Sequence, residues 1–106
     1  MKNIENDIKT LIQSELKDDF TISNWHGVEL GRCLVEPYLE TFENSFVEGE
    51  TLGLYVVLKE DPETNTGYQI VYDPQCGKFG LSVLGKETRR VFLGYYGTFL
   101  ETLEGM

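Results

Sequence analysis

The chain has 106 residues, a formal net charge of −9, and thirteen aromatic side chains: six Tyr, six Phe and one Trp. This length is typical of one domain, so we expect a single domain over residues 1–106. The aromatic content excludes an intrinsically disordered chain, because disordered segments contain few aromatic residues. The negative charge disfavours direct binding to nucleic acids, because it would repel their phosphates.

Two features predict a cytoplasmic protein that does not contact membranes. Residues 1–7 contain acids where a signal peptide has a basic segment followed by an apolar one. The longest apolar run, from Leu52 to Leu58, is far shorter than the ~20 residues of a membrane-spanning helix. In that compartment Cys33 and Cys76 are expected to be reduced thiols, each a small apolar side chain in or near the core.

The first half of the chain predicts one helix and contains one segment whose pattern fits both a helix and a strand. Apolar residues recur with a helical period in residues 4–17, so we expect a helix there. Thr21 to Gly31 has a mixed pattern that fits a loop or a short strand. Arg32 to Phe46 fits both a helix and a strand, and Pro37 suits the start of a helix or an edge strand. We favour an edge strand.

The second half predicts an antiparallel meander. Three strands are expected, at Leu52 to Glu60, Tyr68 to Tyr72 and Phe79 to Leu84, separated by turn-rich segments. Their apolar residues alternate, which is typical of a sheet with one buried face. Gln69, Gly80 and Ser82 belong to the opposite face, which we expect to be partly wet.

The C-terminal segment predicts a short strand and a last helix. The strand is expected at Arg89 to Leu93 and the helix at Tyr95 to Glu104, with Tyr96 in the core after a tight turn. A start at Thr98 is the alternative, because Thr98 and Glu101 have capping-box spacing. The fold class expected is therefore α+β: an antiparallel sheet of four to five strands in a meander, with an N-terminal and a C-terminal helix packed on one face.

No motif for catalysis, metal binding or cofactor binding is present in the sequence. The chain has one histidine, His26, and a Cys33 to His26 dyad would lack an evident third group to orient it. No phosphate-binding glycine pattern, nucleophile elbow or zinc spacing occurs. We therefore expect no catalytic residues, no metal and no cofactor.

The acidic residues are concentrated in the middle of the chain. The segment from Cys33 to Gly77 contains nine acidic residues and one lysine, so its net charge is −8. Such a segment attracts a basic protein, although a surface kept soluble by its charge is the simpler interpretation. The candidate partner-binding residues are Glu36, Glu40, Glu43, Glu48, Glu50, Glu60, Asp61 and Glu63.

An alternative function is a small-ligand-binding or enzymatic domain. Its pocket would be lined by Tyr55, Tyr68, Tyr72 and Trp25. A cavity of ~300 Å³ or more with convergent polar groups would favour this alternative. A filled core with a flat acidic face would favour the binding protein.

Three C-terminal stretches carry a family resemblance: Gly67-Tyr-Gln-Ile-Val-Tyr-Asp73, Phe79-Gly-Leu-Ser82, and Phe92 to Met106. Together they resemble small bacterial proteins of the kind found as immunity proteins beside polymorphic toxins. The Pro-x-x-Tyr and Asn-Gly signatures of the best-known superfamily of this kind are missing, so no functional residue is carried over. The resemblance implies a protein that blocks a toxin by binding to it.

Overall fold

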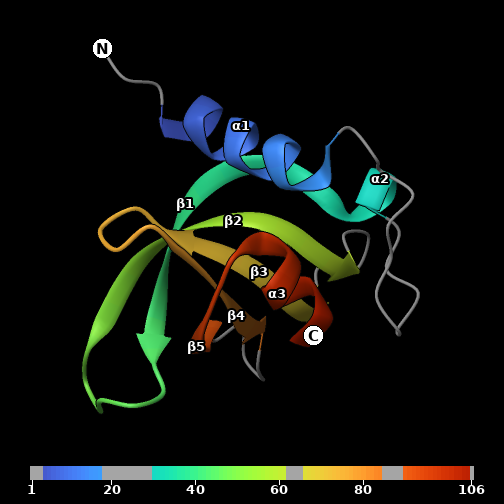
Figure 1. The fold of residues 1–106 in the computed structure, drawn as a ribbon. Coiled ribbons are helices and arrows are strands. Elements are labelled where there is room, and N and C mark those ends of the chain that lie inside the picture. Colours follow the sequence, from blue (N-terminus) through green and yellow to red (C-terminus); the bar gives the residue numbers. More distant parts are fainter. Residues whose placement is uncertain (1–3, 18–29, 62–65, 85–89, 106) are drawn as a thin grey trace.

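The computed structural model describes residues 4–17, 30–61, 66–84 and 90–105 (Figure 1). Five strands and three helices are described in these ranges. They are α1 (Ile4–Leu16), α2 (Leu30–Cys33), β1 (Leu34–Asn44), β2 (Thr51–Asp61), β3 (Thr66–Asp73), β4 (Lys78–Leu84), β5 (Arg90–Gly97) and α3 (Phe99–Gly105). No helix in the described ranges has the length and apolar character needed to cross a membrane.

The strands form a meander that closes into a barrel. Each strand pairs antiparallel with the next, and β1 then pairs in parallel with β5. The closing contact is short, with Glu43 opposite Val91 and Asn44 opposite Phe92. The predicted α+β fold, with a meander and a helix at each end of the chain, is confirmed, and closure of the sheet is an addition to it.

The uncertain segment after Arg32 is a strand from Leu34 onward, preceded by the single turn of α2. It is not an edge strand, because its C-terminal end also pairs with β5. Pro37 lies where the pairing of β1 with β2 shifts register, between Leu34 and Tyr38. A proline has no N–H to donate, so this irregular stretch is where β1 tolerates it.

Apolar residues of the helices cover the outer face of the barrel. In Figure 1, α1 crosses above β1 and α3 lies across the middle of the sheet. The stripe predicted for α1 is confirmed at Ile8, Ile12 and Leu16, which are buried, whereas Leu11 is 43% exposed. The buried cluster under the helices consists of Ile8, Ile12, Leu16, Leu30, Cys33, Val57, Leu58, Ile70, Phe79, Leu81, Phe99 and Leu103.

A second cluster fills the inside of the barrel. It consists of Phe42, Leu54, Val56, Val71 and Phe92, which come from four of the five strands. Alternate residues of a strand point to opposite faces, so these side chains lie opposite the helix-covered ones. Gln69 and Ser82 share this interior and are 2% and 0% exposed. The expectation of a partly wet face was therefore wrong, because closure buries both faces.

The C-terminal helix starts at the later of the two predicted positions. β5 continues to Gly97, and Thr98 caps α3: the N–H of Glu101 donates to Thr98 Oγ1 at 3.1 Å, and the N–H of Thr98 donates to Glu101 Oε1 at 3.3 Å. The prediction of a buried Tyr96 in a strand-to-helix turn was wrong. Tyr96 lies in β5, is 44% exposed, and packs its ring against Gly105 of α3.

Candidate functional site

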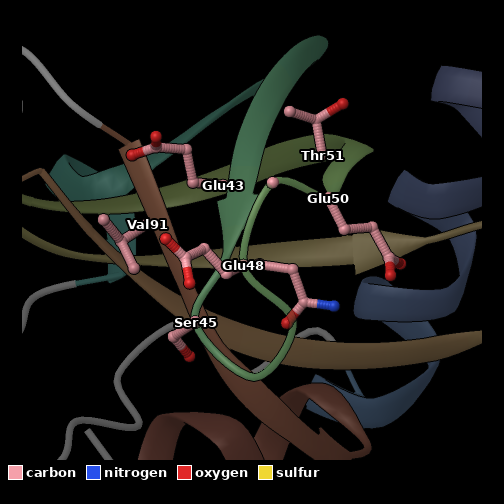
Figure 2. A pocket seen from close by; sticks show the side chains of 8 residues that line it. Glu43, Ser45, Glu48, Glu50, Thr51 and Val91 are labelled. Carbon is pink, nitrogen blue, oxygen red and sulfur yellow. The ribbon is translucent and has the colours of Figure 1, made fainter.

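A depression of about 370 Å³ opens at the turn between β1 and β2. Figure 1 shows this turn projecting from the end of the barrel that lies away from α1. In Figure 2 the carboxylates of Glu43 and Glu48 point to the side on which Val91 lies, and that of Glu50 points the other way. The lining residues are Glu43, Asn44, Ser45, Glu48, Gly49, Glu50, Thr51 and Val91.

Hydrogen bonds fix the backbone of this turn. The N–H of Asn44 donates to the carbonyl of Glu50 at 2.9 Å, and the N–H of Glu50 donates to the carbonyl of Val47 at 3.2 Å. The Asn44 side chain adds an Asx turn, because its Oδ1 accepts from the N–H of Phe46 at 2.9 Å. Gly49 has φ +81°, a conformation that residues with a side chain rarely adopt.

Two apolar side chains lie in the same turn. Phe46 is 72% exposed and Val47 is 48% exposed. The turn also contacts β5, since the N–H of Ser45 donates to the carbonyl of Phe92 at 3.3 Å. Aromatic side chains, Phe among them, are enriched in protein-binding surfaces relative to the rest of the surface.

Of the seven predicted partner-binding residues that the structure describes, it brings three together. Glu43, Glu48 and Glu50 lie around the depression. Glu36 lies seven residues before Glu43 on β1, about 23 Å away along an extended strand. Its carboxylate pairs with Lys9 of α1 at 2.6 Å.

Three of the other four predicted residues lie elsewhere, and the fourth is not described. Glu40 is partly buried and pairs with Arg90 of β5 at 3.8 Å. Glu60 lies near the far end of β2, where its side chain lies over Gly67 of β3. Asp61 is the last residue of that strand, and Glu63 lies outside the described residues. The acidic segment is therefore not one face, and its carboxylates separate toward opposite ends of one hairpin.

None of the three described tyrosines of the alternative small-ligand pocket lines the depression at the β1–β2 turn. Tyr55 and Tyr72 pack against the helix-covered core, and Tyr68 is 40% exposed. Trp25 lies outside the described residues. A second depression, of about 280 Å³, lies between α1 and β1 and contains no tyrosine: it is lined by Lys9, Ile12, Gln13, Leu34, Val35, Glu36 and Pro37.

One polar cluster lies at the turn between β3 and β4. The phenol of Tyr95 donates to Oδ2 of Asp73 at 2.5 Å, and Asp73 is only 7% exposed. Partial burial, together with this hydrogen bond to a carboxylate, raises the pKa of Tyr95. The phenol therefore stays protonated at neutral pH, and a protonated phenol is not a base.

Cys33 and Cys76 do not form a disulfide, and only one of them is buried. Cys33 lies in the core, with its Sγ 3.6 Å from the carbonyl oxygen of Glu60. Cys76 is exposed in the turn between β3 and β4, so the expectation that it lies in or near the core was wrong. His26, the other member of the dyad considered above, lies outside the described residues.

The residues of the β1–β2 turn offer charge, hydrogen bonding and apolar contact. Within the part of the chain that the structure describes, no three His, Cys, Asp or Glu side chains are grouped to hold a metal ion. The sequence indicated the carboxylates, and it did not indicate Phe46, Val47 or the Asn44 turn. Comparison with known proteins found no match, whether among family models, curated proteins or solved structures.

Proposed function

We propose that this chain is a non-catalytic binding protein that recognises a basic protein through the β1–β2 turn. The observation that carries the proposal is the grouping of Glu43, Glu48 and Glu50 around one depression. Glu48 and Glu50 have no ion-pair partner among the described residues, whereas Glu36 and Glu40 each have one. Carboxylates that are not neutralised within the protein remain available to a cationic partner.

An immunity-type role fits this proposal. A toxin inhibitor needs no catalytic group, because it acts by covering a surface of its target. The resemblance of the C-terminal stretches to immunity proteins of bacterial toxin systems supports the same role. We therefore propose a basic toxin as the partner, encoded beside this chain.

The test compares two variants with equal charge. Glu48→Gln/Glu50→Gln removes two charges at the turn, and Glu5→Gln/Asp7→Asn removes two exposed charges from the first turn of α1. Each changes the net charge from −9 to −7. The product of the neighbouring gene is the probe, and its association rate is measured across a salt series.

We expect the turn variant to associate more slowly than wild type and the α1 variant to associate at nearly the wild-type rate. The difference should shrink at high salt, because the Debye length falls from about 8 Å at physiological ionic strength to about 3 Å at 1 M. Equal association rates for the two variants would contradict a role for the turn. A neighbouring product that does not bind, or that is not toxic when expressed alone, would contradict the immunity role.

A further inference from the structure

Two exposed apolar side chains, Phe46 and Val47, lie in the β1–β2 turn where it meets β5. The ring of Phe46 lies over Gly94 of β5, about 3.5 Å from where a Cβ would be. We call these two apolar residues, Phe46 and Val47, the turn surface.

Gly94 places β5 against the turn surface. Its φ of +145° is disfavoured for residues with a side chain, which accounts for the glycine. A Cβ here would meet the Phe46 ring at an ordinary contact distance of 3.5–3.6 Å, so the ring packs closely on this part of β5. The position of Phe46 therefore depends on a strand that lies 48 residues further along the chain, counted from Phe46 to Gly94.

The turn surface is held in place before any partner binds. The hydrogen bonds of Asn44, Ser45 and Glu50 fix the backbone on both sides of Phe46. A fixed backbone loses little conformational entropy when it is covered, so its contacts contribute more of their free energy to affinity. Aromatic side chains in such positions are typical anchors of protein interfaces.

Charge then selects the partner. The depression with Glu43, Glu48 and Glu50 lies in the same turn as Phe46 and Val47. A segment that covers the turn surface brings its neighbouring residues over these carboxylates. An acidic neighbour would be repelled by the carboxylates, and a neutral one would remove water from them without replacing its hydrogen bonds. An arginine or lysine would form charge-assisted hydrogen bonds with them.

We propose that the β1–β2 turn docks a basic, amphipathic polypeptide segment. Its apolar side chains pack on Phe46 and Val47, and an arginine or lysine lies in the depression beside Glu48. This inference rests on the proposed function and specifies the chemistry that the partner must present. It makes Phe46 the anchor that sets how long the complex lasts, while the carboxylates set how fast it forms.

The test selects peptides from a randomised displayed library on the wild-type protein. We expect enriched peptides to combine apolar residues with a nearby arginine or lysine. One enriched peptide is then synthesised, and its binding kinetics are measured with Phe46→Ala, Val47→Ala, Glu48→Gln/Glu50→Gln and a control, Leu39→Ala. Leu39 is 60% exposed on β1, away from the turn.

Phe46→Ala should weaken binding about tenfold or more, mainly through faster dissociation. Val47→Ala should weaken binding less, Glu48→Gln/Glu50→Gln should slow association, and Leu39→Ala should bind as wild type does. The melting temperature of each variant is measured first, and Val47→Ala replaces Phe46→Ala if that variant is unstable.

Three outcomes would overturn the inference. Failure to enrich any peptide would do so. Peptides that need the carboxylates but bind Phe46→Ala and Val47→Ala normally would do so as well, while leaving the proposed function in place. Peptides that need Phe46 but carry no positive charge would overturn both the inference and the proposed function.

Discussion

Glu15 of α1 caps the N-terminus of α3. Its two carboxylate oxygens accept hydrogen bonds from the backbone N–H groups of Phe99 and Leu100, at 3.1 and 3.0 Å. Thr98 Oγ1 accepts from the next N–H, that of Glu101. The first four N–H groups of a helix have no partner within its backbone, and the fourth one here, that of the cap residue Thr98, donates to Glu101 Oε1, so all four are satisfied. It also joins the two helices, which lie at opposite ends of the chain.

Glu15→Ala should therefore destabilise the protein by about 1–2 kcal/mol, because it removes a capping acceptor and a negative charge from a helix N-terminus. Ser14→Ala, at the exposed position next to it, is the control and should change stability by less than about 0.5 kcal/mol. Urea denaturation measures both. Equal effects of the two variants would mean that water caps α3 equally well.

Gly80→Ala should destabilise the barrel by about 1–3 kcal/mol. A Cβ at this position would lie 2.4 Å from the carbonyl oxygen of Gly94 and 2.8 Å from the Phe92 ring. The first of these atoms belongs to the backbone, so β5 itself would have to move. Gly53→Ala is the matched control, because its Cβ would meet only Leu39 Cδ1 at an ordinary 3.6 Å. A loss of stability that is the same for both variants would argue against this close approach of β4 and β5.

The sequence predicted the helices and strands better than it predicted the closure of the sheet into a barrel. Alternation in β3 and β4 identified the face that the helices cover, and the capping box marked the start of α3. Closure depends on two pairs between β1 and β5, which no local pattern encodes. One hint was present: Val71 lies between Ile70 and Tyr72, and an apolar residue on each face of a strand indicates burial on both faces.

The site was harder to predict, because charge along a sequence does not show which carboxylates meet. The segment from Glu36 to Asp61 is mostly two long strands, and extended strands carry charged residues apart. In addition, Glu36 forms an ion pair with Lys9 and Glu40 forms one with Arg90, so both carboxylates are partly neutralised within the protein. Phe46 was not identified as exposed, because an apolar residue in an uncertain segment is more often buried.

Leu54→Ala should cost about 2–4 kcal/mol, because Leu54 is fully buried inside the barrel and its loss leaves a cavity. Leu39→Ala removes the same side chain from an exposed position and should be close to neutral. Thermal or chemical denaturation distinguishes them. A Leu54→Ala variant as stable as Leu39→Ala would place β2 at the surface.

Alkaline pH should weaken the hydrogen bond between Tyr95 and Asp73. Folding raises the pKa of Tyr95 above its ordinary value near 10. Below about pH 10 the phenol is protonated in both the folded and the unfolded chain, so the hydrogen bond contributes its full amount to the free energy of unfolding. Above it, the unfolded chain loses the phenolic proton first, and the stabilisation is lost as the pH rises toward the pKa of the folded state. The difference in unfolding free energy between wild type and Tyr95→Phe should thus be constant from pH 7 to about 10 and then fall.

Absorbance of phenolate in the native protein gives an independent measurement of the same group. Wild type should show two phenols that titrate late, because the pKa values of Tyr95 and Tyr72 are both raised, and Tyr95→Phe should lose one of them. Tyr68→Phe, which removes an exposed phenol elsewhere, should retain both. Two late phenols in Tyr95→Phe would contradict the raised pKa of Tyr95.

Ser82 and Gln69 form a buried polar pair inside the barrel. Ser82 Oγ donates to Gln69 Oε1 at 3.4 Å, and both residues lie among apolar side chains. Ser82→Ala leaves the Gln69 amide buried without this donor, which should cost about 1–3 kcal/mol. Gln69→Leu leaves a hydroxyl that can turn to another acceptor, so it should cost less. The double variant buries no polar side chain at either position, so it should be more stable than the sum of the two single effects predicts.

The measurement is a double-mutant cycle from urea denaturation. Strictly additive effects would mean that the pair contributes no coupling, and that the interior of this barrel tolerates an isolated amide.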